Sequence, residues 1–265
     1  EKSKKLALGL NVKGLLNIQF AIKDEELFIL EANPRASRTM PFVAKVTGNQ
    51  IIKAGTLLML GYSIDEVRNK TKYLSSSSNK VAIKKAIFPW SRFPAEDTML
   101  GPEMKATGEV LGVGKEFGTA LNKAYAAAGV EINNKEKGIF VTLSDSEKPN
   151  FIKTVNKYLE LGFTLYSTEG TGKFLKTNGI DSVIVGKADD LGQTSLTIIE
   201  DKLVSLVINT PTYANELSDG WKIRRLSHET GVAVVSSVRE ADAFIEAFLN
   251  QNLVLDDLEV IQDVS

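Results

Sequence analysis

The segment Leu15–Arg38, LLNIQFAIKDEELFILEANPRASR, determines how the first part of the chain folds. It contains two apolar runs rich in strand-forming residues, Leu15–Ile22 and Leu27–Ala32. The charged triplet Asp24-Glu25-Glu26 separates them. This pattern predicts a β-hairpin with a three-residue turn.

Three oxygen-bearing side chains meet on one face of this predicted hairpin. A three-residue turn places Lys23 opposite Leu27, and counting back along both strands then places Gln19 opposite Glu31. Glu31 and Asn33 are two residues apart on a strand, so they share a face. One carboxylate and two amides suit a hard cation such as Mg²⁺, which takes oxygen ligands and leaves positions for phosphate oxygens.

Two arginines, Arg35 and Arg38, follow this patch directly. Guanidinium groups beside a metal ion are well placed to bind phosphate. The spacing alone is also compatible with a polar hairpin face and two surface arginines. Further along, apolar periodicity over Ile51–Leu60 predicts a helix that ends at Gly61. The prolines and glycines of residues 80–120 predict irregular, loop-rich structure.

From residue 138 the pattern alternates between strands and helices. Alternating strands and helices predict an α/β domain with a mostly parallel sheet. The polar run Asn133–Lys137 predicts a domain boundary, which divides the chain into residues 1–132 and 133–265. The expected strands are Ile139–Leu143, Phe163–Tyr166, Val183–Val185, Leu203–Ile208 and Val232–Val235, and the expected helices are Pro149–Leu161, Phe174–Asn178 and Glu240–Leu249.

The second domain carries candidate residues for an anion site. In Ser167–Gly172, between a strand and a helix, glycines permit close backbone approach and the helix start offers free N–H groups, while Thr168 and Thr171 add hydroxyls. Lys148 and Lys187 lie at other strand-to-helix junctions, which gather at the carboxyl ends of a parallel sheet. A tight turn with hydroxyl capping and two surface lysines is the structural alternative.

The end of the fourth predicted strand carries Asn209 and Thr210. The Asn209 amide can both donate and accept hydrogen bonds, so it suits a nucleobase or a carboxylate. The alternative is an asparagine that forms a turn two residues before Pro211.

Composition limits the classes of function. The chain has 265 residues and a net charge of −1, so its overall charge gives no indication of binding to nucleic acid or to a membrane surface. It has no cysteine and one histidine, His228, so neither a thiolate site nor a multi-histidine zinc site can form within it. We expect a cytoplasmic protein without a membrane span. The start, Glu1–Lys5, lacks an initiator methionine, so we expect a piece of a longer chain.

Two stretches identify a family. Asn17–Phe20 followed by Glu31–Thr39 resembles the metal-binding end of the ATP-grasp fold, and is most similar to that of carbamoyl-phosphate synthetase large subunits. Leu100–Val110, LGPEMKATGEV, is similar to a stretch characteristic of that enzyme. The resemblance continues to the C-terminal region. It implies the C-terminal part of an ATP-grasp domain, built of antiparallel strands plus helices, followed by a Rossmann-like, parallel-sheet domain similar to methylglyoxal synthase.

The resemblance also implies a reaction. This part of the family belongs to the second ATP-using half, which phosphorylates carbamate to give carbamoyl phosphate. It implies ATP and Mg²⁺ (or Mn²⁺) as cofactors. Gln19, Glu31 and Asn33 are the implied metal ligands, and Gln19 and Glu31 are also implied to bind ATP. Arg35 and Arg38 are the implied catalytic residues at the transferring phosphoryl group. The nucleotide-binding part of the fold lies upstream in the family, so we expect this chain alone to be inactive.

The regulatory domain of the family holds a small-molecule effector. Bacterial members are commonly inhibited by UMP. Animal urea-cycle members are activated by N-acetylglutamate, and they carry a tryptophan near the position that Lys187 has here. A lysine there, together with Lys148, favours a phosphorylated ligand such as UMP. Arginine and pyrimidine synthesis both stay open as the pathway. The resemblance implies these effector residues: Lys148, Thr168, Thr171, Lys187, Asn209 and Thr210.

The family also implies partners and leaves two rival functions. A glutaminase small subunit supplies ammonia, the upstream part of the large subunit completes the enzyme, and the whole forms a higher oligomer. A methylglyoxal synthase is one rival, but Leu191–Thr194 stands in place of its Gly-Asp-Gln-Gln run and His228 lies downstream of its histidine. A free-standing, nucleotide-binding regulatory module is the other, although a sensor would not need the Gln19, Glu31 and Asn33 patch.

Overall fold

The structure is a computed structural model that describes residues 1–72, 80–93, 96–99, 104, 107–130, 132, 138–210 and 218–250. It divides into two compact units, residues 1–79 with 254–265 and residues 80–253, and each is considered by itself. We call them unit 1 and unit 2. The run Asn133–Lys137 and most of Leu100–Val110 lie outside the described residues. The division into domains 1–132 and 133–265 therefore stays a prediction.

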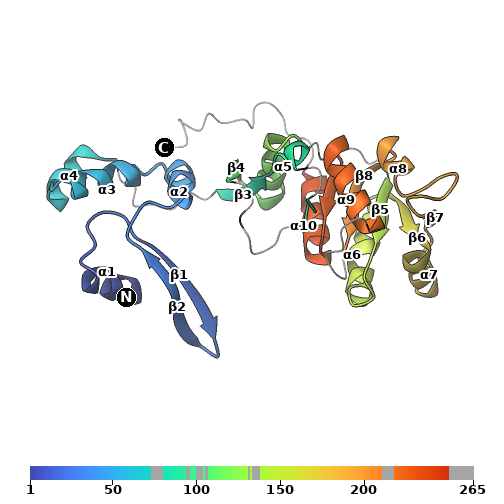
Figure 1. The fold of residues 1–265 in the computed structure, drawn as a ribbon, viewed down its shortest axis with the longest axis horizontal. Helices are drawn as coiled ribbons and strands as arrows, with labels where there is room; N and C mark the ends of the chain where they lie inside the picture. Colours follow the sequence, from blue (N-terminus) through green and yellow to red (C-terminus); the bar gives the residue numbers. More distant parts are fainter. Residues whose placement is uncertain are drawn as a thin grey trace. The chain divides into compact units, whose positions relative to one another are not determined.

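Unit 1 consists of one hairpin and short helices (Figure 1). The predicted helix over residues 51–60 is confirmed, because α3 ends at Met59 and Gly61 follows with a φ of 93°. The described elements are α1 (Lys2–Gly9), β1 (Asn17–Lys23), β2 (Glu26–Asn33), α2 (Thr39–Thr47), α3 (Ile51–Met59) and α4 (Ile64–Lys70).

The hairpin forms as predicted, but its turn differs. Lys23 pairs with Glu26, so the turn has two residues, Asp24 and Glu25, with φ values of 49° and 63°. The prediction of a three-residue turn was wrong. Gln19 nevertheless pairs with Glu31, because the register shifts by one residue at a β-bulge beside Gln19. The bulge compensates for the shorter turn.

Unit 2 is an α/β unit around a parallel sheet, as the alternating pattern predicts. Its five strands are parallel and lie in the order β7-β6-β5-β8-β9. The elements are β3 (Val81–Ile87), η1 (Trp90–Arg92), β4 (Gly108–Gly114), α5 (Phe117–Ala127), β5 (Gly138–Thr142), α6 (Lys148–Glu160), β6 (Thr164–Thr168), α7 (Glu169–Thr177), β7 (Val183–Val185), α8 (Thr197–Glu200), β8 (Val204–Asn209), α9 (Asp219–Thr230), β9 (Ala233–Val235) and α10 (Val238–Leu249).

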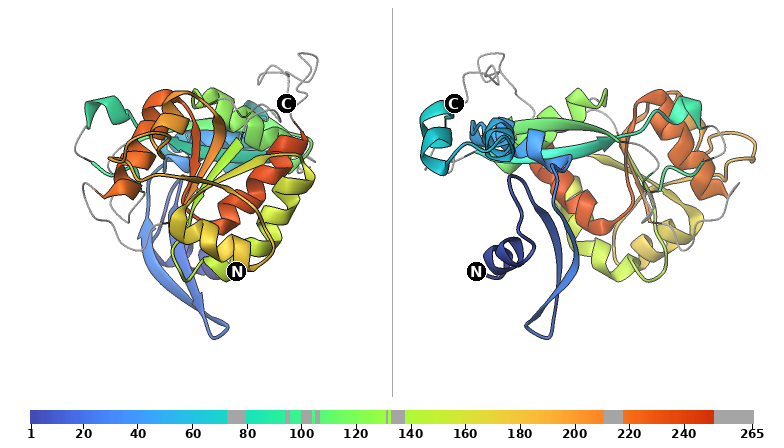
Figure 2. Two further views of the ribbon diagram at one scale, coloured as in Figure 1. Left: turned by 90° about the vertical axis from the view of Figure 1, so that its right-hand side faces the viewer. Right: turned by 60° about the vertical axis from the view of Figure 1, so that its left-hand side comes forward.

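Helices cover both faces of this sheet, as Figure 2 shows. Successive residues of β5 face opposite sides, so Ile139 and Val141 join one hydrophobic cluster and Phe140 joins the other. The first cluster includes residues of α5, α6 and α10, and the second includes residues of α8 and α9. Burial on both faces explains why β5 and β8 are mainly apolar runs.

The prediction of irregular, loop-rich structure over residues 80–120 was wrong for residues 81–87 and 108–120, whereas the described residues between them contain only the short 3₁₀ helix η1. β3 and β4 pair as antiparallel strands, and α5 follows β4. The glycines have a packing role, because a Cβ at Gly112 would lie 2.1 Å from the Ala120 carbonyl oxygen. A Cβ at Gly114 would lie 2.8 Å from the Ala120 nitrogen. The absence of side chains there lets α5 lie directly on β4.

The start of α7 also differs from the prediction. The helix begins at Glu169, immediately after β6, and not at Phe174. Gly170 and Gly172 therefore belong to its first turns. Thr168 occupies the N-cap position without a side-chain capping hydrogen bond, so the alternative of a hydroxyl-capped turn is not what forms.

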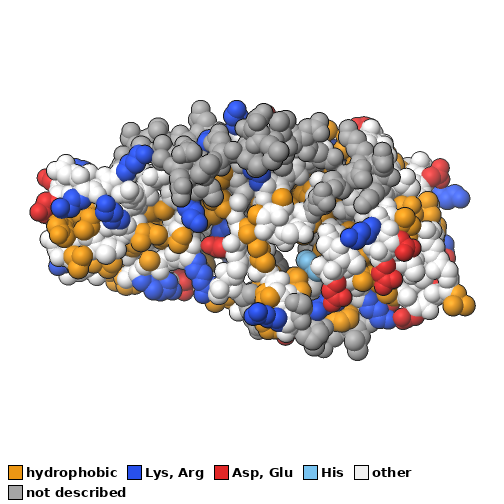
Figure 3. Space-filling model, turned by 90° about the horizontal axis from the view of Figure 1, so that it is seen from above, with side chains coloured by type: hydrophobic (Ala, Val, Ile, Leu, Met, Phe, Trp, Pro, Cys, Tyr) orange, Lys and Arg blue, Asp and Glu red, His pale blue; other side chains and the backbone are white. Residues whose placement is uncertain are grey.

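Large apolar side chains remain on the surface of unit 1. On the face drawn in Figure 3, hydrophobic side chains of this unit lie between lysines and arginines. Ile22, Leu30 and Leu60 are 75%, 65% and 71% exposed. Within residues 1–72, only Gly55 and Val67 are buried. No described helix has the length and apolar character needed to cross a bilayer.

Candidate functional site

The predicted polar patch forms at the open end of the β1–β2 hairpin. The Gln19 amide nitrogen donates to Oε1 of Glu31 at 2.5 Å, and the Asn33 amide nitrogen donates to the same oxygen at 2.8 Å. Asn17, opposite Asn33 and two residues from Gln19, adds an amide that the prediction did not assign. Gln19 and Glu31 are exposed, so the patch is open to a ligand.

The donor chemistry of this patch fits a hard cation. The structure brings the carboxylate of Glu31 within hydrogen-bond distance of two amides, and a half-turn of either amide presents its oxygen instead of its nitrogen. Carboxylate and amide oxygens are ligands that Mg²⁺ accepts. The described residues contain no group of three or more His, Cys, Asp or Glu side chains placed for a metal ion. The two amides are therefore essential to this candidate site.

The two predicted arginines follow β2. Arg35 is exposed and its guanidinium donates to the Ala36 carbonyl at 3.2 Å, and Arg38 is the residue before α2. Ser37, between them, has a buried hydroxyl oxygen without a hydrogen-bond partner among the described residues. Such an atom is normally satisfied, so Ser37 is a further polar group that a ligand could engage here.

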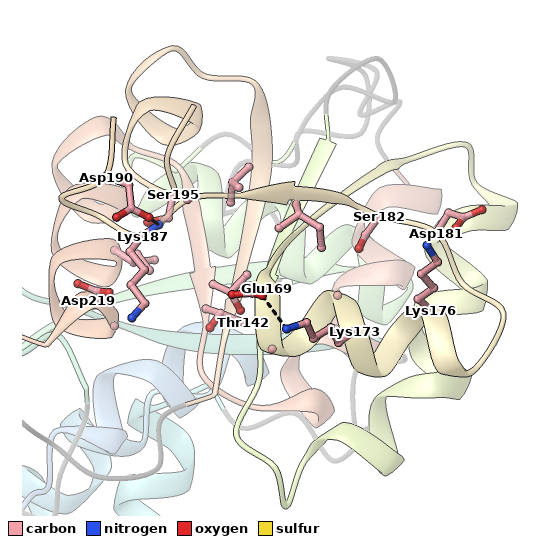
Figure 4. A pocket seen from close by; sticks show the side chains of 18 residues that line it. Thr142, Glu169, Lys173, Lys176, Asp181, Ser182, Lys187, Asp190, Ser195 and Asp219 are labelled. Atoms are coloured by element: carbon pink, nitrogen blue, oxygen red, sulfur yellow. Dashed lines mark hydrogen bonds and ion pairs between the residues drawn. The ribbon is translucent and has the colours of Figure 1, made fainter. Parts of the chain in front are cut away.

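A cavity of about 810 Å³ opens at the carboxyl ends of the strands in unit 2 (Figure 4). From the central strand β5 the chain continues to β6 and β7 on one side and then crosses to β8 and β9 on the other, so the strand order reverses between β5 and β8. This is the switch point at which parallel α/β sheets bind ligands. The lining includes Thr142, Thr168, Lys173, Val185, Lys187, Ser195 and Gly220.

Two of the predicted effector residues, Thr168 and Lys187, line this cavity. Thr171 lies next to Thr168 and outside the lining. Its hydroxyl oxygen accepts two hydrogen bonds, one from the Thr168 hydroxyl at 3.3 Å and one from the Leu143 N–H at 3.1 Å. These bonds tie the loop after β5 to the start of α7. Thr171 is 2% exposed, so it positions neighbouring groups and does not face open space.

The other three predicted residues lie outside the cavity lining. Thr210 accepts from the Ser144 N–H at 2.8 Å. Asn209 is buried, and its amide oxygen accepts from Arg224 at 2.6 Å. The Lys148 ammonium pairs with Asp145 at 2.6 Å, and that hydrogen bond holds the pKa of the Asp145 carboxyl below its usual value.

The charges around the cavity are mixed. Glu169 pairs with Lys173 at 2.6 Å, and this hydrogen bond and the charges of Lys173 and Lys187 lower the pKa of Glu169. Lys187 extends into the cavity between Asp219 and Glu169, whereas Lys176 and Asp181 lie together at its opposite end (Figure 4). Lys187 and the N–H groups at the start of α7 are the groups with which this part of the cavity could hold an anion, and the carboxylates of Asp219 and Glu169 lie on either side of Lys187.

Sequence reasoning missed most of the cavity lining, including Ser195, Asp219 and Gly220. Ser195 is 1% exposed and its hydroxyl has no hydrogen-bond partner among the described residues. Asp219 and Gly220 come from the first turn of α9. An isolated serine in a polar loop carries no local signal. The α9 residues could have been found only by placing that helix, for which the sequence analysis made no prediction.

The single histidine lies elsewhere in unit 2. His228 contributes to a second cavity of about 330 Å³, together with Lys85, Trp90 and Tyr125. Burial and the positive charges of Lys85 and Arg225 lower the pKa of His228 to about 4. His228 does not line the larger cavity, which is unlike the histidine-containing site of a methylglyoxal synthase.

Comparison with known proteins matches two parts of the chain to two family models. Residues 1–67 match the family described as carbamoyl-phosphate synthase L chain, ATP binding domain, and residues 150–236 match the MGS-like domain. An ATP-binding segment joined to an MGS-like domain in this order defines the C-terminal region of a carbamoyl phosphate synthase.

Individual relatives give the same result. The carbamoyl phosphate synthase large chain, C-terminal section, of Aquifex aeolicus is 38% identical over 93% of this chain, and that of Methanocaldococcus jannaschii is 39% identical over 92%. The large chain of Brucella suis is 41% identical over 91%. The chain spans 48%, 40% and 21% of the lengths of these three relatives. It belongs to the family of carbamoyl phosphate synthase large chains and corresponds to their C-terminal part.

Proposed function

We propose that this chain forms the end of the carbamate-phosphorylating ATP-grasp domain and the effector-binding domain of a glutamine-dependent carbamoyl-phosphate synthase. The family match at both ends supports the assignment. The observation that carries the catalytic part is the convergence of Gln19 and Asn33 on one oxygen of Glu31. The observation that carries the regulatory part is the cavity at the switch point of the parallel sheet.

In the catalytic part, Gln19, Glu31 and Asn33 would hold Mg²⁺ or Mn²⁺, with Gln19 and Glu31 nearest the ATP. When bound, the metal ion neutralises charge on the ATP phosphates. Arg35 and Arg38, which follow the patch on the same chain segment, would neutralise and orient the phosphoryl group that passes to carbamate. Phosphoryl transfer depends mainly on such positioning and charge neutralisation.

In the regulatory part, the cavity would take UMP or a related phosphorylated effector. Lys187, Thr168 and the first turn of α7 surround the region best suited to the phosphate. Thr171 and Thr210 would support the site indirectly, since they accept hydrogen bonds from the loop after β5. Lys148, which pairs with Asp145 in that loop, would hold the loop's own conformation. A volume of about 810 Å³ is ample for a nucleotide, which needs a pocket of several hundred Å³.

The remaining parts of the proposal concern the whole enzyme. A glutaminase small subunit would supply ammonia, the upstream part of the large subunit would supply the nucleotide pocket, and the enzyme would work in the cytoplasm as a higher oligomer. Its product would enter pyrimidine or arginine synthesis. This chain alone would not turn over substrate, because the patch supplies only metal and phosphate contacts.

Calorimetry with UMP tests the regulatory part. We expect saturable binding to the unmodified chain and a loss of roughly tenfold or more in affinity for Lys187→Ala, because a charge-assisted hydrogen bond to phosphate contributes about 1.5–3 kcal/mol. Lys176→Ala is the matched control, since Lys176 lines the opposite end of the same cavity (Figure 4). Absence of UMP binding, or equal effects of the two variants, would contradict the proposed site.

Mn²⁺ binding followed by electron paramagnetic resonance tests the catalytic part. Glu31→Ala should remove Mn²⁺ binding, because Glu31 is the one carboxylate of the patch. Glu26→Ala is the control, since Glu26 is an exposed glutamate on the same strand, opposite Lys23. Mn²⁺ binding that survives in Glu31→Ala would rule out the hairpin face as the metal site.

A second candidate, a free-standing effector-binding module, has one observation in its favour. The cavity and its supporting hydrophobic clusters lie wholly within unit 2. Effector binding by unit 2 alone is therefore compatible with both proposals. The metal test at Glu31 separates them.

A further inference from the structure

Two neighbouring arginines on α9 are buried in unit 2. Arg224 and Arg225 are 3% and 7% exposed. A buried guanidinium is tolerated only when its donors are satisfied, so the partners of these side chains show what each arginine holds in place. Arg225 donates to the carbonyl oxygens of Phe93 and Trp90 at 2.7 Å and 2.8 Å. Arg225 therefore anchors the backbone around η1.

Arg224 joins two side chains that are far apart in the sequence. Its Nε donates to Asp97 at 3.0 Å, and a second nitrogen also contacts that carboxylate. Its third nitrogen donates to Oδ1 of Asn209 at 2.6 Å. One guanidinium thus connects the segment 96–99 with the end of β8.

This contact determines which way the Asn209 amide points. A guanidinium has only donors, so the amide oxygen must face it and the amide nitrogen must face away. The reversed amide would place two N–H donors against a buried cation. Asn209 is therefore held as a hydrogen-bond donor toward its other neighbours.

Gly220 leaves space between this amide and the cavity. It lines the cavity, and a Cβ built on it would lie 3.1 Å from the Arg224 guanidinium and 3.5 Å from Nδ2 of Asn209. A side chain at this position would fill the space beside the amide. With glycine, a ligand group can approach Asn209 from the cavity.

We propose that Arg224 is a positioning residue of the effector site. It presents Asn209 as a hydrogen-bond donor, so the ligand group that meets Asn209 is an acceptor, such as a carbonyl oxygen of a nucleobase. Asp97 holds the guanidinium from the other side, so the placement of Asn209 also depends on the segment 96–99. The inference rests on the proposed effector function of the cavity and specifies which part of the ligand is recognised there.

The test uses UMP calorimetry on the whole chain. Arg224→Lys keeps the charge but loses the fork that spans Asp97 and Asn209, so UMP affinity should fall roughly tenfold. Arg225→Lys is the matched control, because it is the adjacent buried arginine and contacts backbone carbonyls and Glu229, but not Asn209. UMP affinity should change less than about twofold in that variant.

A second variant tests whether Asn209 acts as a hydrogen-bond donor to the ligand. Asn209→Asp keeps the shape and the contact with Arg224 but removes the amide donors, so thermal stability should be retained while UMP affinity falls roughly tenfold. The fall should persist in about 0.5 M salt, which screens repulsion between the new carboxylate and the phosphate. Gly220→Ala should also weaken UMP binding, and it leaves Arg224 intact if Arg224→Lys does not fold.

The outcomes are distinct. If the unmodified chain does not bind UMP, the proposed effector function fails and this inference fails with it. If the unmodified chain binds UMP, but Asn209→Asp binds it equally well, Asn209 is not a donor to the ligand and only this inference is overturned. The same conclusion follows if Arg224→Lys and Arg225→Lys lose affinity to the same extent.

Discussion

Units 1 and 2 place their candidate sites in opposite settings. Residues 1–72 bury only Gly55 and Val67, and their candidate metal ligands lie on an open hairpin face. Residues 80–250 form two hydrophobic clusters on the two faces of a parallel sheet, and their candidate site is a cavity at its edge. A binding site can therefore be assembled by short-range strand pairing in one unit and by a complete core in the other.

The largest expected difference between the two units is in their ability to fold alone. Residues 80–253 produced alone should unfold in a cooperative urea transition, because their core is self-contained. Residues 1–79 produced alone should show no such transition, since they bury too little apolar surface to offset chain entropy. Circular dichroism during urea titration measures both. A cooperative transition in residues 1–79 would refute the contrast.

A matched pair of phenylalanines sharpens the comparison. Phe140 is fully buried in β5, so Phe140→Ala should lower the unfolding free energy of unit 2 by about 3–5 kcal/mol. Phe28 in β2 is 46% exposed, so Phe28→Ala should change the unfolding free energy by less than about 1 kcal/mol. Urea denaturation of the whole chain measures both variants, and similar losses would contradict the burial pattern.

The third prediction concerns pH and affects unit 2, which contains the single histidine. The pKa of His228 is about 4 in the folded protein, against 6.5 for an unperturbed side chain, because burial and the charges of Lys85 and Arg225 disfavour its protonated form. The unfolded state therefore binds more protons between these values, and stability decreases as the pH falls from about 6.5 toward 4.

This linkage should lower the unfolding free energy by roughly 2 kcal/mol between pH 7.5 and pH 5. Urea midpoints at the two pH values measure the change. His228→Gln should flatten the dependence, because the group that takes up the proton is gone. A pH dependence that is unaltered in this variant would assign the effect to other groups.

The smallest prediction concerns the hairpin turn of unit 1. Asp24 and Glu25 both have positive φ angles, which asparagine and glycine adopt with less strain. The double variant Asp24→Asn, Glu25→Gly should stabilise the hairpin by about 0.5–1 kcal/mol. Amide hydrogen exchange in β1 should slow, while exchange in β5 stays unchanged as the internal control. Faster exchange in β1 would contradict the two-residue turn.

Local patterns predicted most elements of the parallel sheet. The apolar runs that became β5 and β8 were located within one residue, because strands buried on both faces must be continuously apolar. The run Val183–Val185 was also located correctly as β7, although Val183 and Ile184 are exposed. The α7 start was misplaced because Gly170 and Gly172 suggest a loop. Gly172 lies within α7, and packing explains why this helical residue is a glycine, since a Cβ there would lie 2.7 Å from the hydroxyl oxygen of the buried Ser167.

Residues 80–120 show a similar limit. Their glycines and prolines indicate loops when only neighbours in the sequence are considered. In the structure, Gly112 and Gly114 lie under α5, where only glycine lets a helix backbone contact a strand. The reason for these glycines is a tertiary contact, which no local pattern can reveal.

The sequence by itself determined the family, the α/β class of unit 2 and the face of the hairpin that carries Gln19, Glu31 and Asn33. These follow from alternation along strands and from short motifs, both of which are local. Only the tertiary structure decided the β-bulge that keeps Gln19 opposite Glu31, and the cavity walls contributed by Ser195 and α9. The tertiary structure also decided the orientation of the Asn209 amide, because the buried guanidinium of Arg224 in α9 sets it through a contact that forms only when the chain is packed.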